Sequence, residues 1–392
     1  MYLIKSSSIL PPSVYRDDLG MCGRIETQKI YVSFDFSIIL GTDEAGGGVK
    51  RKRLFCIHMN IFKQIISTEN IVSAWREFLC GKRNKYDVQL FSLNLMSNIF
   101  KLQRELEEKR YTHGPYHAFK ISDPKPRDIH KASVRDRLLH HALYRVLYPI
   151  FDPTFIADSF SCRNNKGTHK ALQRFQRFVW KVSKNNTRQC WILKCDIRKF
   201  FASIDHETLI SILEKRVNDT DAIWLCKEII KSFETEVGSM RGLPLGNLTS
   251  QLFANVYMNE FGQYIKHKLR TKHYLRYADD FAIFSNNRKE LEELIPVIRL
   301  FLDEKLHLSL HNDKLFIETI GSGVDFLGWV HFPNHRVVRT KTKRRMMKRI
   351  AEHTTQETIN SYLGLLKHGN TRKLEKQIYR FTFLQEKDIL PK

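Results

Sequence analysis

Three aspartates stand in apolar surroundings where a carboxylate needs a counter-charge. Asp279 and Asp280 are adjacent in the strand-like run RYADDFAIFS (276–285), and Asp196 ends the β-rich run CWILKCDI (190–197). Adjacent carboxylates repel each other, and a buried one must be paired or bind a metal. The ordinary explanation of such a pair is a turn, because Asp favours turns. The chemical explanation is a divalent-metal site at the tip of a hairpin.

The spacing of these acids suggests what such a site would do. If the two strands are neighbours, Asp196 and Asp279 face each other across a sheet, and three carboxylates in one place are untenable without cations. Hard oxygen ligands with open positions suit Mg²⁺, with Mn²⁺ as an alternative. Two such ions about 3.5–4 Å apart are the usual device for in-line phosphoryl transfer. The predicted chemistry is therefore two-metal transfer of a nucleotide.

The charge of the chain points to a polyanionic partner. Its 392 residues include 65 Lys and Arg against 42 Asp and Glu, a formal net charge of +23. Such an excess favours nucleic acid, because basic side chains neutralise phosphates and release counterions. A basic membrane-surface protein is the alternative, but we find no lipidation motif, amphipathic anchor or apolar run of spanning length. We therefore expect no membrane contact.

The seven cysteines and the first residues bear on the compartment. The cysteines are scattered without a CxxC pair, which argues against a disulfide framework and a zinc module. Buried free thiols in a reducing environment are the expected state. The start MYLIKSSSILPPS has too short an apolar stretch for a signal peptide. These features predict a cytoplasmic protein.

Residues 1–58 differ from the rest of the chain. They contain Ser-rich and Pro-Pro pieces, then GTDEAGGG and KRKR, and a triple Gly is typical of a flexible break. Helical periodicity begins only at Met59, which is itself a possible start residue. We expect 1–58 to be a poorly ordered N-terminal extension, or to precede the true start.

Helical and strand-like patterns then interleave without a regular βαβ period. A strand-like piece broken by two prolines occupies 116–133, and apolar half-strands surround the Asp pair, with two more short strands at 314–320 and 324–332. Helical periodicity covers 59–110, 135–151, 205–217, 219–233, 248–269, 288–305 and most of the basic last fifty residues. We predict an α+β fold with a mostly antiparallel sheet.

The order of these motifs resembles that of reverse transcriptases. YADD, preceded by a strand, an Asp and an aromatic five residues on, is similar to motifs C and A of that family. DPKPR (123–127), SFSCRNNKGTHKAL (159–172), GLPLGNLTSQLFANVYMN (242–259), LSLHNDKLFI (308–317) and VDFLGWVHF (324–332) resemble its other motifs, in order. The resemblance implies a right-hand fold, with fingers at 59–189 that include the start of the palm, palm at 190–335 and a helical, basic thumb at 336–392.

The resemblance also assigns roles to residues. Asp196, Asp279, Asp280 and the Ile197 carbonyl would hold the metals, although neighbouring residues on a strand point to opposite faces, which makes Asp280 the weaker ligand. Phe201 would exclude the ribose 2′-OH, with a core Phe as the alternative. Arg127 and Lys125 match residues that bind the triphosphate, and a solvated basic turn is the alternative. Lys314 matches a lysine that protonates pyrophosphate, and a simple phosphate or solvent contact is the alternative.

Motif B narrows the resemblance. The common pattern QGxxxSP is here LGNLTSQ, with Leu245 at the Gln position and Gln251 at the Pro position. Gly246, Asn247 and Ser250 would form the nucleotide-binding loop, or simply cap a helix. This form resembles the enzymes of diversity-generating retroelements, in which an aliphatic residue at this position accompanies errors opposite template adenine.

Further residues are candidates for nucleic-acid contact. Arg137 would hold template or support the fingers. Phe326, Leu327, Gly328 and Trp329 resemble the primer grip, with core packing as the alternative for Phe326 and Leu327. The run RTKTKRRMMKR (339–349) opens the thumb, and its cations would contact the template–primer backbone or form a solvated face: Lys341, Lys343, Arg344, Arg345, Lys348 and Arg349.

Together these features predict an RNA-directed DNA polymerase. The implied partners are an RNA template, a DNA or RNA primer, dNTPs and a small helical accessory protein. A defence-type or group II intron-like reverse transcriptase is the first rival, although the chain stops about fifty residues after motif E without an endonuclease-like tail. A catalytically silent RNA-binding scaffold is the second rival, and the complete aspartate set argues against it.

Overall fold

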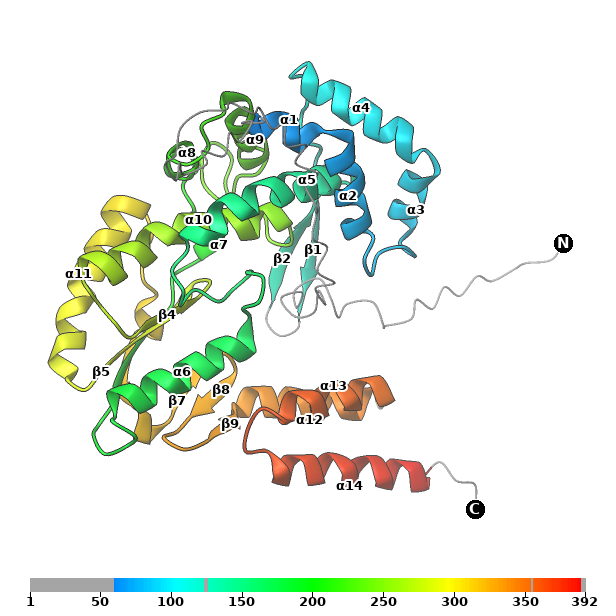
Figure 1. Ribbon diagram of the computed structural model, residues 1–392. Helices are drawn as coiled ribbons and strands as arrows, with labels where there is room; N and C mark the ends of the chain where they lie inside the picture. Colours follow the sequence, from blue (N-terminus) through cyan, green and yellow to red (C-terminus); the bar gives the residue numbers. More distant parts are fainter. Residues whose placement is uncertain (1–59, 123–125, 354, 389–392) are drawn as a thin grey trace, which may run out of the picture.

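The computed structural model describes residues 60–122, 126–353 and 355–388, with side chains described as far as residue 380. The predicted N-terminal extension, Met59 and Lys125 lie outside these ranges. We keep the names fingers, palm and thumb for the described parts of the predicted ranges. Figure 1 shows most of the fingers at the top, together with the helices at 206–231. The palm sheet lies at the lower left with the helix at 168–182 beside it, and the thumb helices lie at the lower right.

The palm is built on a four-stranded antiparallel sheet with the order β4-β5-β3-β6. Its strands are β3 (Trp191–Cys195), β4 (Tyr274–Tyr277), β5 (Asp280–Ser285) and β6 (Phe316–Thr319). β3 lies in the centre, where Cys195 pairs with Phe281 of β5 and Lys194 pairs with Phe316 of β6. The strand that ends before Asp196 and the strand that begins at Asp280 are therefore neighbours, as predicted.

Alternate residues of these strands feed two separate cores, as the two-residue period of a strand requires. Leu193, Phe281 and Ile283 face the larger core, which α10 (Leu248–Gln263) and α11 (Arg288–Leu306) help to form. Ile192 and Phe284 face the second core, where α6 (Thr168–Val182) packs. The central part of the sheet is buried on both faces, so its strands are mostly apolar.

The fingers consist of helices around α5 and a separate hairpin. The hairpin of β1 (His117–Ile121) and β2 (Arg127–Lys131) brackets the two prolines, as predicted. The helices of this region, with two from the palm segment that pack against them, are α1 (Ile61–Ile66), α2 (Thr68–Phe78), α3 (Tyr86–Leu93), α4 (Leu95–Glu107), α5 (Val134–Phe151), α8 (His206–Glu214) and α9 (Thr220–Lys231).

Polar caps fix where these helices begin. The Ser133 side chain accepts a hydrogen bond from the Asp136 backbone N–H and so starts α5, and Asp205 caps α8 in the same way. Asp219 caps α9 and also accepts a hydrogen bond of 2.8 Å from the Phe62 backbone N–H at the start of α1. Such caps satisfy backbone donors that a helix leaves unpaired, and here one of them also joins two helices.

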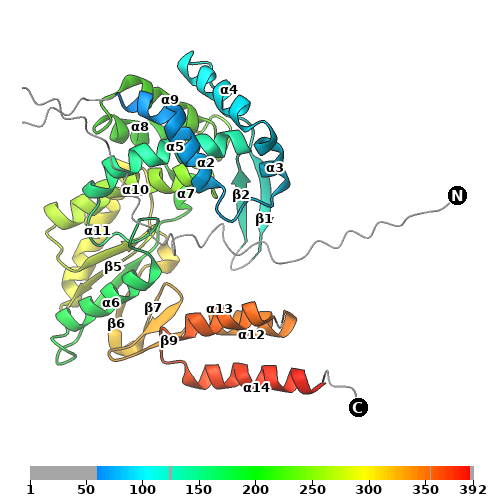
Figure 2. The ribbon, with the colours of Figure 1, turned by 45° about the vertical axis from the view of Figure 1, so that its right-hand side comes forward.

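A small second sheet links palm and thumb. It consists of β7 (Val324–Phe326), β8 (Trp329–His331) and β9 (Arg336–Val338), in that order. The thumb follows as α12 (Thr340–Glu352), α13 (Gln356–Leu366) and α14 (Arg372–Asp388). Figure 2 shows these helices lying side by side, across from the β1–β2 hairpin.

The predicted fold class is confirmed: this is an α+β, right-hand polymerase fold with an antiparallel palm sheet and a helical thumb. One predicted helix is shorter than expected, because α10 ends at Gln263 and a π-helical turn, Tyr264–Lys268, replaces its last turns. The cysteines in the described ranges are free thiols, and Cys190, Cys195 and Cys226 are buried. None of the described helices is both long and apolar enough to cross a bilayer.

Candidate active site

The Asp pair lies at a tight hairpin. Tyr277 pairs with Asp280, so Ala278 and Asp279 form a two-residue loop between β4 and β5. Ala278 has a φ of 55°, in the left-handed region, where a residue with a Cβ is strained. Strain of this kind is found at functional turns. Here it places Asp279 at the tip and Asp280 at the first position of β5.

Asp196 reaches the same edge of the sheet from β3. It follows Cys195, which pairs with Phe281, so continuing the register by one residue brings Asp196 beside Asp280. The charge of Asp196 raises the pKa of both Asp279 and Asp280, which shows that the three carboxylates lie within electrostatic range. The three acids therefore come to one end of the sheet, but the register sets Asp280, and not Asp279 as expected, opposite Asp196.

The segment after α11 holds Asp196 from the other side. The Lys314 Nζ donates a hydrogen bond of 2.9 Å to Asp196 Oδ1, and the His311 backbone N–H donates one of 2.8 Å to the Asp196 carbonyl. Ile197 forms a bridge with Leu310, but the bonds flanking it are made by Asp196 and Arg198. This pairing does not use the Ile197 carbonyl, which remains a candidate metal ligand.

The two hairpin carboxyls are poorly neutralised. Burial raises the pKa of Asp279, and Asp196 raises it further, while a backbone hydrogen bond, Lys314 and Arg127 oppose the rise. Burial raises the pKa of Asp280 to about 6, with Asp279 and Asp196 adding to the rise and with Lys194 and Lys314 opposing it. The protein's own cations therefore leave a deficit of positive charge at this edge.

A divalent cation fits that deficit chemically. Within the described ranges, no group of three or more His, Cys, Asp or Glu side chains is arranged to hold a metal ion as it stands, and the Lys314 ammonium occupies one oxygen of Asp196. The donor set nevertheless consists of hard carboxylate oxygens with raised pKa values, which a bound Mg²⁺ or Mn²⁺ would stabilise in the charged form.

Arg276 is a functional candidate that the sequence analysis did not single out. This fully buried side chain donates through Nη1 to the Ala278 carbonyl at 3.0 Å and through Nη2 to Ser159 Oγ at 3.0 Å. Its Nη1 also lies 3.5 Å from Asn255 Oδ1 on α10. Arg276 thus ties the strained turn to two segments that are distant in the chain, the 159–172 segment and α10. In the sequence, the sign of this role is a single basic residue, Arg276, within the apolar half-strand that precedes the Asp pair.

The motif B loop docks on the fingers hairpin. The His130 backbone N–H donates to the Leu245 carbonyl at 3.1 Å, and Asn247 Nδ2 donates to the His130 carbonyl at 2.8 Å. Gly246 has a φ of 101°, and a Cβ on it would lie 2.9 Å from Ile129. The close approach therefore requires glycine, and Asn247 anchors the loop rather than capping α10 with its side chain.

Other predicted nucleotide contacts lie around this junction. Arg127 is exposed at the start of β2, and its charge lowers the pKa of Asp279, so it lies within electrostatic range of the turn. Ser250 is buried in the first turn of α10, and Gln251 beside it is half-buried. Lys125 lies outside the described residues.

The two aromatic residues that follow Asp196 differ in burial. Phe200 is buried in the core, whereas Phe201 is half-buried at the start of α7 (Phe200–Ser203). The Phe201 carbonyl accepts a 2.8 Å hydrogen bond from the Leu243 backbone N–H. This bond joins the predicted sugar-gate residue to the segment that leads into the motif B loop.

Several predicted nucleic-acid contacts have structural partners. Arg137 Nη2 donates to Asp87 Oδ2 at 2.7 Å and its guanidinium lies over the Phe78 ring, which favours the fingers-support role over template contact. Phe326 is buried and the half-buried Leu327 packs against the same core, as the core-packing alternative for these two residues required, and Trp329 is buried as well. Leu327 and Gly328 both have positive φ, the geometry of a tight hairpin turn, so a primer contact by this motif would fall on that turn.

The basic face of the thumb is carried by α12. Lys341, Lys343, Arg344 and Lys348 are exposed, and Lys348 lies 3.6 Å from Glu352. Arg345 and Arg349 are half-buried. The opposite side of α12 buries Met346 and Ile350 in a thumb core of its own. One face of the helix therefore packs and the other presents cations.

Comparison with known proteins gives a consistent picture. The family model described as reverse transcriptase (RNA-dependent DNA polymerase) matches residues 120–331, more than half of the chain. Protein YkfC of Escherichia coli (strain K12) is 25% identical over 281 residues, which cover 62% of this chain and 71% of YkfC. Group II intron-encoded protein LtrA of Lactococcus lactis subsp. cremoris is 23% identical over 364 residues, covering 74% of this chain and 57% of LtrA.

Similarity to solved structures is weaker. Apo telomerase from Candida tropicalis, truncated from its C-terminal domain, matches with a TM-score of 0.44 and 12% identity, over 62% of this chain and 60% of that chain. This likeness is too low to support a functional conclusion.

Proposed function

The chain belongs to the reverse transcriptase family, whose RNA-dependent DNA polymerase model covers residues 120–331, and from this premise we propose a two-metal enzyme of the error-prone retroelement type. That the protein is an RNA-directed DNA polymerase follows from family membership. The proposal concerns its site residues, its ions and its template. The observation that carries it is the meeting of Asp196, Asp279 and Asp280 at one edge of the palm sheet.

The proposed site divides its tasks among these residues. The three aspartates, with the Ile197 carbonyl, would hold two Mg²⁺ ions, which when bound activate the primer 3′-OH and stabilise charge on the phosphates. Lys314 holds Asp196 through Oδ1 and carries the proton that pyrophosphate needs on leaving. Arg127 supplies a guanidinium, which suits phosphate oxygens. The attacking oxygen forms a bond to the α-phosphorus as the bond to pyrophosphate breaks.

Leu245 supports the retroelement assignment. It lies in the loop that docks on β2, with its carbonyl bonded to His130, and its side chain is half-buried. An aliphatic side chain there offers the incoming base pair no hydrogen bond, so wrong pairs lose little by comparison with correct ones. We propose that the enzyme copies an RNA template repeat into cDNA with errors directed to template adenine.

The test is primer extension on a defined RNA template with Mg²⁺, followed by sequencing of the cDNA. We expect synthesis, with misincorporation concentrated opposite adenine and reduced in Leu245→Gln. Leu248→Gln serves as the control, because Leu248 is a half-buried leucine in the same segment, at the first position of α10. Errors spread evenly over the four template bases would refute the retroelement type, and absence of any synthesis would favour the scaffold.

A group II intron-type enzyme is the second candidate. LtrA, a relative of this chain, is group II intron-encoded, and this chain spans 57% of its length. Such an enzyme predicts a low and even error rate on the same templates, so the same sequencing experiment separates the two. The partners that we propose are an RNA template, a primer, dNTPs and a small accessory protein, and the net charge of +23 suits the RNA.

A further inference from the structure

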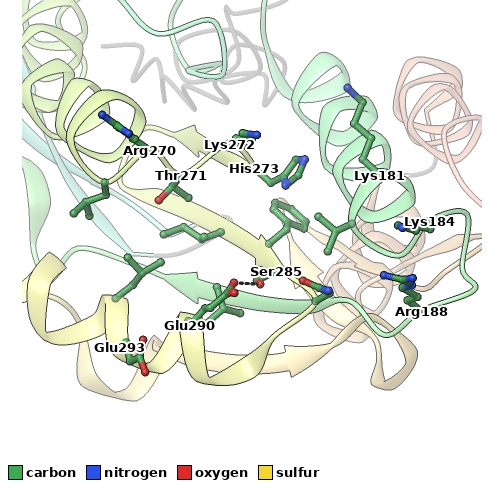
Figure 3. Close-up of a pocket in the computed structure, with 17 residues that line it drawn as sticks. Lys181, Lys184, Arg188, Arg270, Thr271, Lys272, His273, Ser285, Glu290 and Glu293 are labelled. Atoms are coloured by element: carbon green, nitrogen blue, oxygen red, sulfur yellow. Dashed lines mark hydrogen bonds between the residues drawn. The ribbon is translucent and has the colours of Figure 1, made fainter.

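A basic hollow lies at the end of the palm sheet away from the aspartates. It has a volume of about 590 Å³ and is bounded by the end of α6, the loop after it, the segment before β4, the end of β5 and the start of α11. Figure 3 shows basic side chains along its upper and right-hand rim and Glu290 and Glu293 on the lower side. The basic side chains that line it are Lys181, Lys184, Arg188, Arg270, Lys272 and His273.

The hollow is distinct from the polymerase site. β5 begins with Asp280 at the catalytic edge and ends with Ser285, which lines the hollow. Five residue steps along a strand span about 17 Å. The cations of the hollow therefore belong to a part of the palm separate from the aspartates.

The cations around the hollow are exposed and lack counter-ions. In the part of the chain that the structure describes, the five Lys and Arg side chains take part in none of the ion pairs, although many other cations of the protein do. The two glutamates do not neutralise them: Glu290 accepts a hydrogen bond of 2.6 Å from Ser285 Oγ on the other side of the hollow. Five like charges around one concavity repel each other unless an anion enters.

The pKa of His273, which also lines the hollow, is lowered. Burial lowers its pKa, and Lys266, Lys181, Lys272 and Arg174 lower it further. Its ring is also packed edge-on against Phe178, with centroids 5.3 Å apart. Burial is thus the main reason that the imidazole stays neutral, and the nearby positive charges add to it, so its ring can offer a phosphate a hydrogen bond from an uncharged N–H.

An exposed aromatic adjoins the cations. Trp180 precedes Lys181 on α6 and is 45% exposed, one of several large apolar side chains that are exposed in the described residues. Basic grooves flanked by exposed aromatics are typical of single-stranded nucleic-acid binding, because phosphates meet cations and bases stack on rings. A membrane surface would instead favour a protruding basic and apolar face over a concave one.

We propose that this rear hollow, defined by Lys181, Lys184, Arg188, Arg270 and Lys272, binds the phosphate backbone of a single-stranded RNA segment outside the catalytic cleft. The proposal rests on the proposed RNA-copying function, for it would let the enzyme hold a second part of its own RNA while copying the first. Binding occurs on the α6 side, away from Glu293, with Trp180 stacking on a base.

The test uses the full chain with its cleft already saturated by an unlabelled RNA–DNA template–primer. A fluorescein-labelled oligo(rU) is then titrated by anisotropy at several salt concentrations. We compare wild type, Lys181→Glu/Lys272→Glu and the matched control Lys63→Glu/Lys231→Glu, which changes charge equally on exposed lysines of α1 and α9. Primer extension by each variant is measured in parallel.

We expect the rear variant to weaken oligo(rU) binding roughly tenfold or more at low salt. We also expect the slope of log affinity against log salt to fall by about 1.4, or about 0.7 for each of two phosphates. The control should bind as wild type does. Trp180→Ala should weaken binding without changing the slope.

Two results would overturn the proposal. One is oligo(rU) binding, or a salt slope, that is the same in the rear variant and in the control. The other is a Lys181→Glu/Lys272→Glu variant that no longer binds phosphatidylserine-containing vesicles, as wild type does, but still binds RNA normally. That result would assign the hollow to a membrane surface. Failure of the polymerase assignment looks different, because primer extension would then be absent from wild type whatever the hollow binds.

Discussion

The two ends of the palm sheet carry opposite charges, and they carry them in opposite ways. At one end, three aspartates are partly buried, and burial raises the pKa of two of them. At the other end, five exposed cations surround a hollow. β5 runs between the two ends, from Asp280 to Ser285, and β3 runs antiparallel beside it.

This difference teaches where single substitutions should matter. A buried charge interacts strongly with its few neighbours, because little water screens it. An exposed charge is screened by salt and shares its task with others. The catalytic end should therefore depend on single residues and the basic regions on their sum.

The largest effect is expected at Asp279. Asp279→Asn keeps the size of the side chain but removes one charge from the proposed metal site, and DNA synthesis should fall on the order of 10³-fold or more, comparable to losing a main stabiliser of transition-state charge. Template–primer affinity and melting temperature should be unchanged. The measurement is primer extension in single turnover.

Asp313→Asn is the matched control for this variant. Asp313 lies beside Lys314, but its side chain is 91% exposed, so its loss should leave synthesis within about twofold, as for an ordinary surface change. Equal losses in the two variants would mean that burial does not distinguish them, and the Asp279 assignment would fail.

The next effect is expected at Arg276. Arg276→Lys keeps the charge, but one ammonium cannot reproduce the two Nη donors to Ala278 and Ser159. A turn displaced by about 1 Å costs roughly 10²-fold in rate, so synthesis should fall by that order. The turnover rate should change more than the affinity for template–primer.

Arg188→Lys makes the same exchange at the other end of the sheet. Arg188 is exposed and lines the rear hollow, and synthesis should not change. If Arg276→Lys retains full synthesis, Arg276 does not position the turn. Dependence of synthesis on single residues would then be expected only of the aspartates at the catalytic end.

Much of the catalytic edge could be predicted from sequence because its signal is local. Apolar half-strands flank the Asp pair, and a strand ends in Asp196, so the hairpin and its neighbour follow from strand period and antiparallel pairing. The amphipathic pattern likewise predicted α5 and the thumb helices. These features depend on residues that are close together in the chain.

The rest depends on contacts between distant segments. Arg276 is a support for the turn only because Ser159 and Asn255 come to it. Asn247 looks like a helix cap, yet its amide bonds the His130 carbonyl, 117 residues away. No local pattern distinguishes a buried, bonded cation from a solvated one.

Burial also decided between the alternatives for the predicted primer grip. Trp329 packs where Gly369 leaves room, since a Cβ there would lie 2.1 Å from its ring. Phe326 stacks on Phe175 at 5.2 Å. Sequence alone could not say which aromatics of this hairpin face the core, because both outcomes require the same residue types.

A third prediction sharpens the contrast through pH. His331 is fully buried, and burial lowers its pKa to about 3, below the ordinary 6.5. Between pH 6.5 and 3, the unfolded chain therefore binds a proton at His331 that the folded protein does not bind. The contribution of the neutral His331 to the free energy of unfolding is complete above pH 6.5 and is lost as the pH falls toward 3. At pH 5 the loss is about 2 kcal/mol, from about 1.36 kcal/mol per pH unit.

His331→Met removes this titration at nearly constant volume. Its free energy of unfolding, measured in denaturant at pH 7.5, 6 and 5, should fall less steeply with acid than that of wild type. His335 is exposed on the same hairpin, and His335→Gln should leave the slope unchanged. A slope that is equal in all three proteins would show that His331 titrates normally.

The smallest effect is expected on the thumb, where the charges are exposed and numerous. Lys343 is one of four exposed cations on α12, so Lys343→Gln should weaken template–primer binding only about two- to threefold at low salt, the weight of one screened phosphate contact. At high salt the difference in affinity should vanish, and the turnover rate of the bound complex should stay constant.

Lys63→Gln is the control, because Lys63 is exposed on α1, and it should have no effect at either salt concentration. A loss from Lys343→Gln that persists at high salt, or that lowers turnover, would mean that this exposed cation acts like a buried one, and burial would no longer separate the residues that position the chemistry from those that hold the nucleic acid.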